Sequence, residues 1–444
     1  MGHSLSNPAS SPARILVFLV ALLLATVVTG PSGAVAGLEI PRCFGRRATI
    51  VGDNRPNRMA GTPRPDVIVS GGGSDIVFGL GGSDLICGGS GSDEVYGGGG
   101  NDKLDGQTGN DYLAGSEGHD LMIGGEGSRD LALFHGAPTS VAVDLRMGTA
   151  RGWGEDHLRG IEDVSGTRHS DELVGDGHRN FLFGQAGNDR IDGLAENDFL
   201  FGGTGDDALV GGGGFDAADY TLSNSGVVIN LGNGTAAGEG QDKLSGIEDA
   251  WGSTHNDNLI GDSSANHLYG WDGPDSLDGR GGNDLIVPGV GDDTVEGGGG
   301  ADFVDYFFGK LSDFLAANPV NVNLTRGVAT GSGTDSLMGI ENISGTNRND
   351  VLTGSEGANA IFGYNGDDEL YGLAGNDWVD GGSGNDFLSG GAGMDWCTTG
   401  ESFEACESSQ PPDDGFLLEA RSESSAPSWL LPRSELENLR RVRR

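Results

Sequence analysis

The chain has little of the material from which most globular enzymes are built. Aromatic residues make up 7% of its 444 residues, and there are 4 cysteines and 26 lysines and arginines against 66 aspartates and glutamates. Such a scarcity of aromatic residues beside 84 glycines leaves little for a conventional hydrophobic core. The formal net charge of −40 argues against nucleic acid or an anionic membrane as a partner.

Familiar catalytic motifs are also absent from the sequence. It contains neither a His-Glu-x-x-His zinc helix nor a Gly-x-Ser-x-Gly nucleophile elbow, and its 8 histidines are scattered. Carboxylates are abundant enough for a glycosidase-like pair by residue type alone. General acid catalysis, however, needs an apolar pocket that raises the pKa of one carboxyl group, and an acidic repeat does not supply it.

A nine-residue repeat occupies most of the chain. Its pattern, Gly-Gly-x-Gly-x-Asp-x-apolar-x, is complete in residues 97–105, GGGGNDKLD. The glycine-rich half can turn tightly, and the Asp-x-apolar half can extend as a short strand whose apolar side chain faces inward. Because one unit cannot bury its single apolar residue alone, we predict that about twenty turns stack into an all-β parallel β-roll, or β-solenoid.

Stacking brings the aspartates of neighbouring turns close together, which is unfavourable unless a cation lies between them. Carboxylate and carbonyl oxygens, with no sulfur or imidazole at fixed positions, suit calcium better than zinc or copper. The alternative is a solvated acidic surface or a disordered acidic chain. Neither explains why the aspartates keep register with apolar residues.

The repeat resembles the RTX, or haemolysin-type, calcium-binding nonapeptide repeat of secreted bacterial proteins. The resemblance implies a β-roll in which the aspartate at the sixth position, with carbonyls of the glycine loops, holds multiple Ca²⁺ ions between adjacent turns. The predicted calcium ligands fall in four sets: Asp66, Asp75, Asp84, Asp93, Asp102, Asp111 and Asp120; Asp171, Asp189, Asp198, Asp207 and Asp216; Asp257, Asp275, Asp284, Asp293 and Asp302; Asp350, Asp368, Asp377, Asp386 and Asp395.

Asparagine replaces aspartate once in each of the last three sets, at Asn180, Asn266 and Asn359. It keeps an oxygen but loses the charge, so we expect calcium there to be weaker or absent. The frame also slips by one residue at Arg129-Asp130, which marks the end of the first set.

The N-terminus has the pattern of an export signal. Arg14 precedes an apolar run over residues 15–28, and the small residues AVA at 34–36 offer a cleavage site. The run is short for a bilayer span and no second one follows, so we expect a secreted, extracellular protein with no integral membrane segment after cleavage. A retained membrane anchor is the alternative. Calcium is plentiful outside the cell.

The four cysteines fit an oxidising destination. Cys397 and Cys406 lie close together at the end of the last set, where a disulfide could clasp the final turn. Cys43 lies just before the repeats and Cys87 within them, which favours a second bridge. A metal–thiolate site is the alternative, although the chain lacks paired Cys-x-x-Cys units.

Three longer units interrupt the nonapeptides. Each opens with alternating strand-like residues, at 141–145, 227–231 and 320–324, and ends in Leu-x-Gly-Ile-Glu. The alternation predicts strands with one buried face, either in line with the solenoid or as small β-insertions. We expect Glu162, Glu248 and Glu341 to be structural or calcium-supporting rather than catalytic.

Aromatic residues gather near these units, at Phe134, Trp153, Tyr220, Trp251 and Tyr306. One interpretation is that they cap the ends of each block, because an open solenoid end presents unpaired strand edges. The other is an exposed surface on which carbohydrate stacks.

These patterns define the expected organisation of the chain. In order, we expect a signal peptide at 1–36, an N-terminal lead at 37–51, β-roll block 1 at 52–133, a β linker unit at 134–165, block 2 at 166–220, a linker unit at 221–251, block 3 at 252–306, a linker unit at 307–344, block 4 with its cysteine clasp at 345–407, and a disordered tail at 408–444.

The expected function is calcium binding without enzymatic activity. We expect the chain to fold on binding extracellular calcium and to serve as a structural or adhesive surface module, whose further partner is cell-surface carbohydrate or cell-wall polymer. The alternative is an extracellular polysaccharide-modifying enzyme that uses the roll as its platform. Activity screens on acidic polysaccharides distinguish the two.

Overall fold

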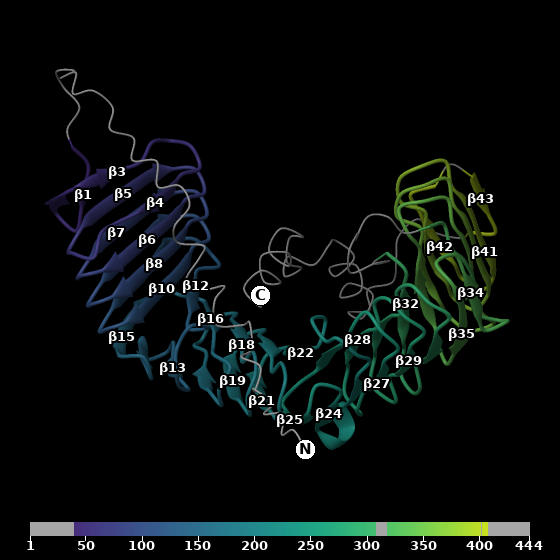
Figure 1. Ribbon diagram of the computed structural model, residues 1–444. Coiled ribbons are helices and arrows are strands. Elements are labelled where there is room, and N and C mark those ends of the chain that lie inside the picture. The colour runs from purple at the N-terminus through teal and green to yellow at the C-terminus, as the bar shows by residue number, and fades with distance from the viewer. Residues whose placement is uncertain (1–39, 308–317, 401, 407–444) are drawn as a thin grey trace, which may run out of the picture. The chain divides into compact units, whose positions relative to one another are not determined.

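The computed structural model describes residues 40–307, 318–400 and 402–406. They form two compact units that divide between Gly127 and Ser128 (Figure 1). The predicted signal peptide at 1–36 and the predicted tail at 408–444 lie outside the described residues. Among the described residues, no helix has the length and apolar character needed to cross a membrane.

Unit 1 consists of two parallel sheets and a small hairpin. One sheet contains β3 (Ile50–Val51), β5 (Val67–Gly72), β7 (Leu85–Ser90), β9 (Lys103–Thr108) and β11 (Leu121–Glu126); the other contains β4 (Arg58–Ala60), β6 (Ile76–Gly81), β8 (Glu94–Gly99) and β10 (Tyr112–Glu117); the antiparallel hairpin is β1 (Arg42–Cys43) and β2 (Arg46–Arg47). Successive nonapeptides therefore alternate between the two sheets.

Unit 2 repeats this arrangement over a longer stretch. Its first sheet contains β13 (Ala142–Asp144), β14 (Thr149–Arg151), β15 (Glu155–Arg159), β17 (Glu172–Val174), β19 (Arg190–Ala195), β21 (Ala208–Gly213), β23 (Val228–Asn230), β24 (Thr235–Ala237), β25 (Gln241–Ser245), β27 (Asn258–Ile260), β29 (Ser276–Asp278), β31 (Thr294–Glu296), β33 (Asn321–Asn323), β34 (Val328–Thr330), β35 (Thr334–Met338), β37 (Val351–Thr353), β39 (Glu369–Ala374), β41 (Phe387–Ala392) and β43 (Ser402–Glu404).

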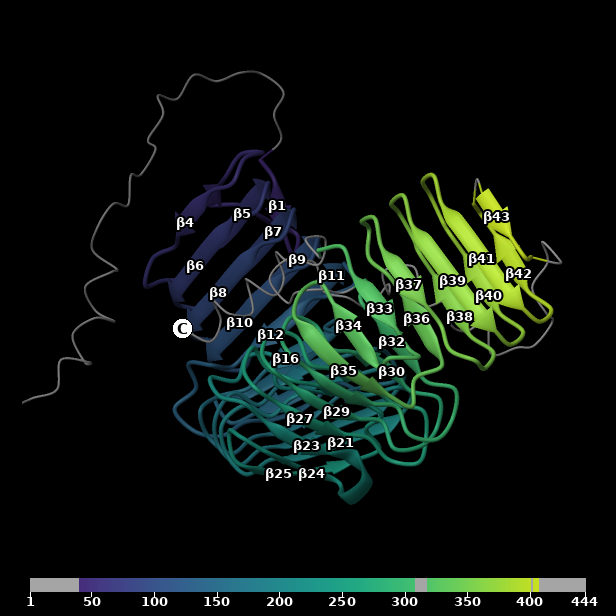
Figure 2. The ribbon, with the colours of Figure 1, turned by 90° about the vertical axis from the view of Figure 1, so that its right-hand side faces the viewer.

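The second sheet of unit 2 is parallel throughout. It contains β12 (Leu131–Leu133), β16 (Asp163–Ser165), β18 (Phe181–Phe183), β20 (Phe199–Phe201), β22 (Ala217–Asp219), β26 (Asp249–Trp251), β28 (His267–Tyr269), β30 (Leu285–Val287), β32 (Phe303–Asp305), β36 (Asn342–Ser344), β38 (Ala360–Phe362), β40 (Trp378–Asp380) and β42 (Trp396–Thr398). Figure 2 shows β37, β39 and β41 of the first sheet lying side by side.

The register of the strands explains the nine-residue period. Ile68 pairs with Ile86 and Ile86 with Leu104, so that one turn of the solenoid is two nonapeptides, or 18 residues. These three side chains are fully buried between the two sheets. Burying a side chain of this size contributes about 1.5–3 kcal/mol, and the stacked turns together provide the core that one repeat lacks.

The predicted all-β parallel solenoid is confirmed, with about 19 turns between residues 50 and 404. Both suspected disulfides are also present. Cys43 is bonded to Cys87 and ties β1 to β7, and Cys397 is bonded to Cys406 at the end of the last block. All four cysteines are therefore paired, with none left for a metal–thiolate site.

The linker units are zigzags of three antiparallel strands inserted into the first sheet. In the second linker unit, β23 pairs with β24 and β24 pairs with β25. The parallel sheet continues from β21 to β25 and from β23 to β27. A single 3₁₀ turn, η3 (Leu231–Asn233), joins β23 to β24. The predicted strands are thus both in line with the solenoid and an insertion. Residues 308–317 of the third linker unit lie outside the described residues.

Candidate metal sites

The predicted aspartates form ladders along the solenoid, because one carboxylate oxygen of each of them except Asp66 accepts a hydrogen bond from a backbone N–H of the preceding turn. Asp84 Oδ1 accepts a hydrogen bond from the Asp66 backbone N–H at 2.8 Å, and Asp284 Oδ1 accepts one from the Asn266 N–H at 2.9 Å. All the predicted aspartates are buried, with at most 9% of their surface exposed. The nine-residue frame of aspartates read from the sequence therefore coincides with the ladders of buried aspartates in the structure.

The second carboxylate oxygen of most ladder aspartates is buried without a donor. Oδ2 has no hydrogen-bond partner among the described residues in Asp75, Asp84, Asp93, Asp102, Asp189, Asp198, Asp207, Asp216, Asp275, Asp284, Asp293, Asp302, Asp368 and Asp377. Asp111, Asp120, Asp386 and Asp395 stand at equivalent positions of the ladder. Native structures rarely leave a buried polar atom unsatisfied, so the same orphan oxygen in turn after turn points to a cation.

Backbone oxygens lie beside these carboxylates. A Cβ atom added to Gly97 would fall against Asp102 Oδ2 and 2.9 Å from the Gly115 carbonyl oxygen, so that both oxygens converge on one small space. A side chain at Gly100, where φ is +129°, would overlap the Gly82 carbonyl oxygen of the previous turn. Glycine therefore keeps open a cradle of hard oxygen atoms, the donor type that Ca²⁺ prefers.

Side chains alone do not complete such a site. Within the described residues, no three His, Cys, Asp or Glu side chains converge in a group that could hold a metal. A ligand set drawn from one aspartate per turn must therefore be completed by backbone carbonyls. This matches calcium, which takes carbonyl oxygens readily, and disfavours zinc.

Burial disfavours the ionised form of the ladder carboxyl groups when no cation is present. It raises the pKa of Asp198 and Asp275 to about 8 and the pKa of Asp284 and Asp293 to about 7, and the charges of nearby aspartates add to the effect. A divalent cation beside the carboxylate would favour the ionised form and oppose this shift.

A protein-family model decides the assignment. The model of the RTX calcium-binding nonapeptide repeat matches residues 57–131, 152–217, 251–286, 289–306 and 337–397, which is more than half of the chain. The chain belongs to the RTX calcium-binding nonapeptide-repeat family. It is thus a calcium-binding repeat protein with a β-solenoid fold. No curated protein matches the sequence significantly.

Four of the predicted RTX ligands differ from the others, because the protein itself supplies donors to the oxygen that is otherwise left free. Thr167 donates its hydroxyl to Asp171 Oδ1 at 3.0 Å and its backbone N–H to Oδ2, and Val141 N–H donates to Oδ1 at 2.7 Å. Asp257 and Asp350 have the same three donors from equivalent positions. At Asp66, the backbone N–H and hydroxyl of Thr62 both donate to Oδ2.

The three asparagines in the frame are also satisfied by protein groups. Nδ2 of Asn180 donates to the Glu162 carbonyl oxygen at 2.7 Å, and its Oδ1 accepts from the Asp176 N–H at 2.8 Å. Asn266 and Asn359 bond in the same way. Weaker or absent calcium at these positions stays a prediction, and these contacts favour it.

The linker units contribute ladder carboxylates that the nonapeptide frame missed. Asp242 Oδ1 accepts from the Asp207 N–H at 2.9 Å, and Asp335 Oδ1 accepts from the Asp293 N–H at 3.2 Å. Glu248 Oε2 accepts from the Asp216 N–H at 3.1 Å. The signal was present in the sequence, since each linker unit carries Asp-x-Leu-x-Gly-Ile-Glu, in which Asp-x-apolar is again the strand half of the repeat.

The aromatic residues near the linker units do not form an open stacking surface. Phe134, Tyr220, Trp251 and Tyr306 are at most 5% exposed, and Trp153 is half-buried. Phe134, Tyr220, Trp251 and Tyr306 therefore pack within the roll, and their role as caps of the blocks stays a prediction.

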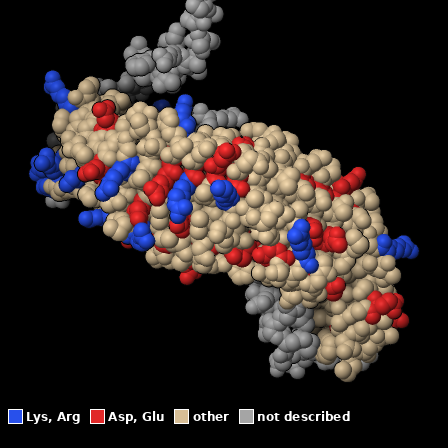
Figure 3. All heavy atoms as spheres, turned by 90° about the horizontal axis from the view of Figure 1, so that it is seen from below, with Lys and Arg blue, Asp and Glu red and all other residues tan. Residues whose placement is uncertain are grey.

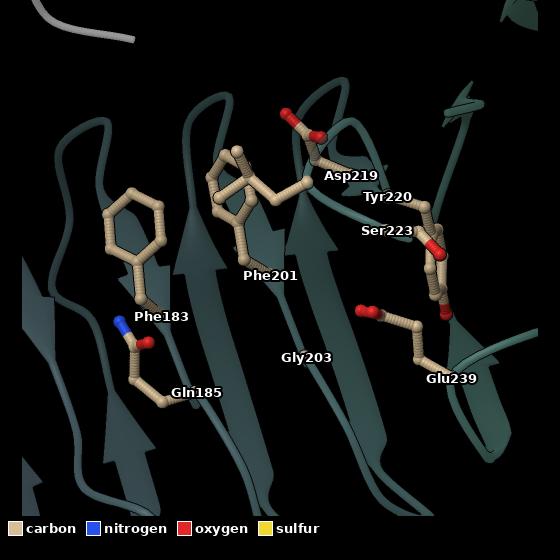
Figure 4. A pocket seen from close by; sticks show the side chains of 9 residues that line it. Phe183, Gln185, Phe201, Gly203, Asp219, Tyr220, Ser223 and Glu239 are labelled. Carbon is tan, nitrogen blue, oxygen red and sulfur yellow. The ribbon is translucent and has the colours of Figure 1, made fainter. Parts of the chain in front are cut away.

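A pocket in unit 2 shows how little space remains beside the aromatic residues. Phe183 and Phe201 stack with their ring centres 4.3 Å apart, and the lining also includes Asp219, Tyr220 and Glu239 (Figure 4). Its volume of about 20 Å³ is room for about one water molecule, too little for a sugar ring.

The visible surface carries charge of both signs. On the face shown in Figure 3, acidic and basic side chains are dispersed over a larger area of other residues. Because the ladder aspartates are buried, a good part of the net negative charge lies inside the roll rather than on its surface.

Proposed function

We propose that this chain is a secreted structural or adhesive module whose roll is completed by calcium outside the cell. The observation that carries the proposal is the row of buried Oδ2 atoms that have no hydrogen-bond partner among the described residues. In the proposed sites, each such aspartate and the carbonyl oxygens of the neighbouring glycine loops hold Ca²⁺ between turns. The ion supplies positive charge where the fold otherwise concentrates buried carboxylates.

The proposed role of calcium is to couple binding to folding. Without calcium, a chain with a net charge of −40 is expanded by self-repulsion and its mid-block carboxylates resist burial as anions. Binding to the folded state alone stabilises that state, so part of the binding free energy becomes folding free energy. Two disulfides and the RTX repeats support an extracellular setting, where calcium is abundant.

We propose a binding role rather than a catalytic one. The ladder aspartates are committed to the preceding turn through Oδ1, and the pocket described above is too small for a polymer substrate. Cell-surface carbohydrate or cell-wall polymer remains the proposed partner of the exterior.

The deciding experiment is a calcium titration of the full chain followed by far-UV circular dichroism, with magnesium as the control. We expect a cooperative gain of β signal with calcium alone, because Mg²⁺ demands tight octahedral geometry and gives up its waters reluctantly. A chain fully folded in chelator, or one that magnesium folds equally well, would contradict the proposal. Binding of the calcium-loaded chain to a panel of glycans and cell-wall polymers tests the adhesive part separately.

A further inference from the structure

The loops that precede the ladder residues fall into two classes by backbone conformation. Before Asp284, the second and fourth residues of the nonapeptide have positive φ, with Arg280 at +70° and Gly282 at +113°. In the loop that precedes Asn266, residues 261–265, no residue has a positive φ. The difference inverts the direction of peptide groups in the loop, and thus decides which of them can reach the side chain at its end.

Loops without positive φ close on themselves by hydrogen bonds; we call them self-closed loops. The Asp262 N–H donates to Asn266 Oδ1 at 2.7 Å. Ser253 donates its N–H and its hydroxyl to Asp257 at 2.6 and 3.0 Å. In the loop before Asp284 the equivalent amide does not reach the carboxylate, whose Oδ2 has no partner among the described residues. Loop conformation therefore separates ladder residues that are fully hydrogen-bonded within the protein from those whose Oδ2 has no partner among the described residues.

Self-closed loops occur at the same place in every block. They precede Asn57 and Asp66 in block 1, Asp171 and Asn180 in block 2, Asp257 and Asn266 in block 3, and Asp350 and Asn359 in block 4. Each pair makes one 18-residue turn, which is the first turn of its block. At the second and fourth positions of its nonapeptide the loop before Asp66 has Thr62 and Arg64, and the Thr62 hydroxyl closes the loop by donating to Asp66 Oδ2. A side chain alone does not decide the conformation, since Leu194 and Glu196 both have positive φ in the loop before Asp198.

The linker carboxylates that follow two of the blocks also have hydrogen-bond donors from the protein. Oδ2 of Asp242, the linker carboxylate that follows block 2, accepts from the Tyr220 hydroxyl at 2.7 Å. Oδ2 of Asp335, which follows block 3, accepts from the Tyr306 hydroxyl at 2.9 Å. A donor hydroxyl places positive charge density where calcium would bind, so these carboxylates have no need of the ion.

We infer that calcium binds only in the middle turns of each block, and that the first turn of each block folds without calcium as the preformed end on which those turns order. The inference rests on the proposed calcium binding and deepens it. Each linker unit and the self-closed turn after it thus form a calcium-independent segment. The calcium-dependent turns lie between such segments, so each block responds to calcium as a separate unit.

The first test is hydrogen–deuterium exchange of the full chain in chelator and in saturating calcium. In chelator, amides of residues 252–266 are expected to exchange about tenfold or more slowly than those of residues 276–296, because their loops keep their hydrogen bonds. Calcium is expected to slow the second segment far more than the first. Equal exchange of the two segments in chelator would overturn the inference.

The second test converts a self-closed loop into a calcium loop. The triple variant Asp262→Gly, Ser264→Gly and Asn266→Asp restores glycine at the two positive-φ positions and the carboxylate at the end. We expect it to bind at least one more calcium ion per chain than the parent, counted by equilibrium dialysis. The double variant Asp262→Gly and Ser264→Gly, which lacks the new carboxylate, is the matched control and should bind the parent's number.

The outcomes separate the inference from the proposed function. If the parent binds calcium and the triple variant binds no more, the inference is wrong and the proposed function stands. If the parent binds no calcium, the proposed function itself fails. If the triple variant does not fold, the exchange experiment on the parent decides, since it needs no substitution.

Discussion

Replacing Asp284 by asparagine is expected to have opposite effects in calcium and in chelator. The Asp284 side chain is 1% exposed; its Oδ1 accepts the Asn266 N–H at 2.9 Å, and its Oδ2 has no partner among the described residues. The introduced asparagine would keep an acceptor for the Asn266 N–H, so the variant removes mainly the charge. The effect thus reports on what the charge does.

The two magnitudes follow from the site. With free calcium at a hundred times the dissociation constant, one site stabilises the folded state by about 2.7 kcal/mol, and Asp284→Asn should lose about that much. In chelator at pH 8 the sign reverses. There, burial and the charges of Asp302 and Asp262 raise the pKa of Asp284 to about 7, so its ionised form is unfavourable and the variant should be at least as stable as the parent.

The assay is urea unfolding of the full chain in both conditions, with hydrogen exchange of residues 276–296 as a local readout, because repeat arrays need not unfold as one unit. Glu296→Gln is the matched control: it removes the same charge from an exposed position of β31 in the same block, and neither condition should change its stability by more than about 0.5 kcal/mol. A similar destabilisation by Asp284→Asn in calcium and in chelator would refute the calcium-ligand role and leave only a structural one.

Further predictions concern pH, the core and the disulfides. In chelator, burial raises the pKa of Asp84 to about 6 and the pKa of Asp198 to about 8 in the folded chain, against 3.8 as the ordinary value, so stability should be greatest below about pH 4 and fall as pH rises toward 8; a urea midpoint that is independent of pH would contradict this. Leu200→Ala, at a fully buried position in a middle turn of block 2, should cost about 2–5 kcal/mol in saturating calcium, where that turn is folded, and an unchanged free energy of unfolding would contradict its role in the core. On loop-closure entropy, removal of the Cys43–Cys87 disulfide, which spans 44 residues, should cost about 4 kcal/mol, against about 3 kcal/mol for the nine-residue Cys397–Cys406 clasp; comparison of the two double serine variants by thermal unfolding checks the order.

The solenoid could be predicted from the sequence because one short pattern encodes turn, strand and core together. The period set by Leu104 and Asp102 fixes which side chains face inward, and an 18-residue turn follows once two units alternate between sheets. The pairing of Cys43 with Cys87 was predictable because Cys43 lies just before the repeats and Cys87 lies within their first turns.

Two features could not be predicted from the repeat: the ladder positions supplied by the linker units, and the conformation of each loop. Asp242 replaces a ladder aspartate 35 residues beyond Asp207, because the inserted hairpin lengthens the chain path without moving the strand that follows. The satisfied state of Asp257 depends on whether the Ser253 amide turns toward it, which is a matter of loop dihedral angles. Pattern matching treats Asp257 and Asp284 as equal, whereas the backbone does not.

Within a block, the link from a ladder Oδ1 to the amide 18 residues earlier gives the roll a direction. A turn is complete only when the next one supplies its carboxylate, as Asp284 does for Asn266 and Asp302 does for Asp284. When the roll forms from its N-terminal end, the newest turn therefore always has an open amide. Any truncation within a block leaves the same defect at its C-terminal end, so stable fragments should end in a linker unit rather than in a run of nonapeptides.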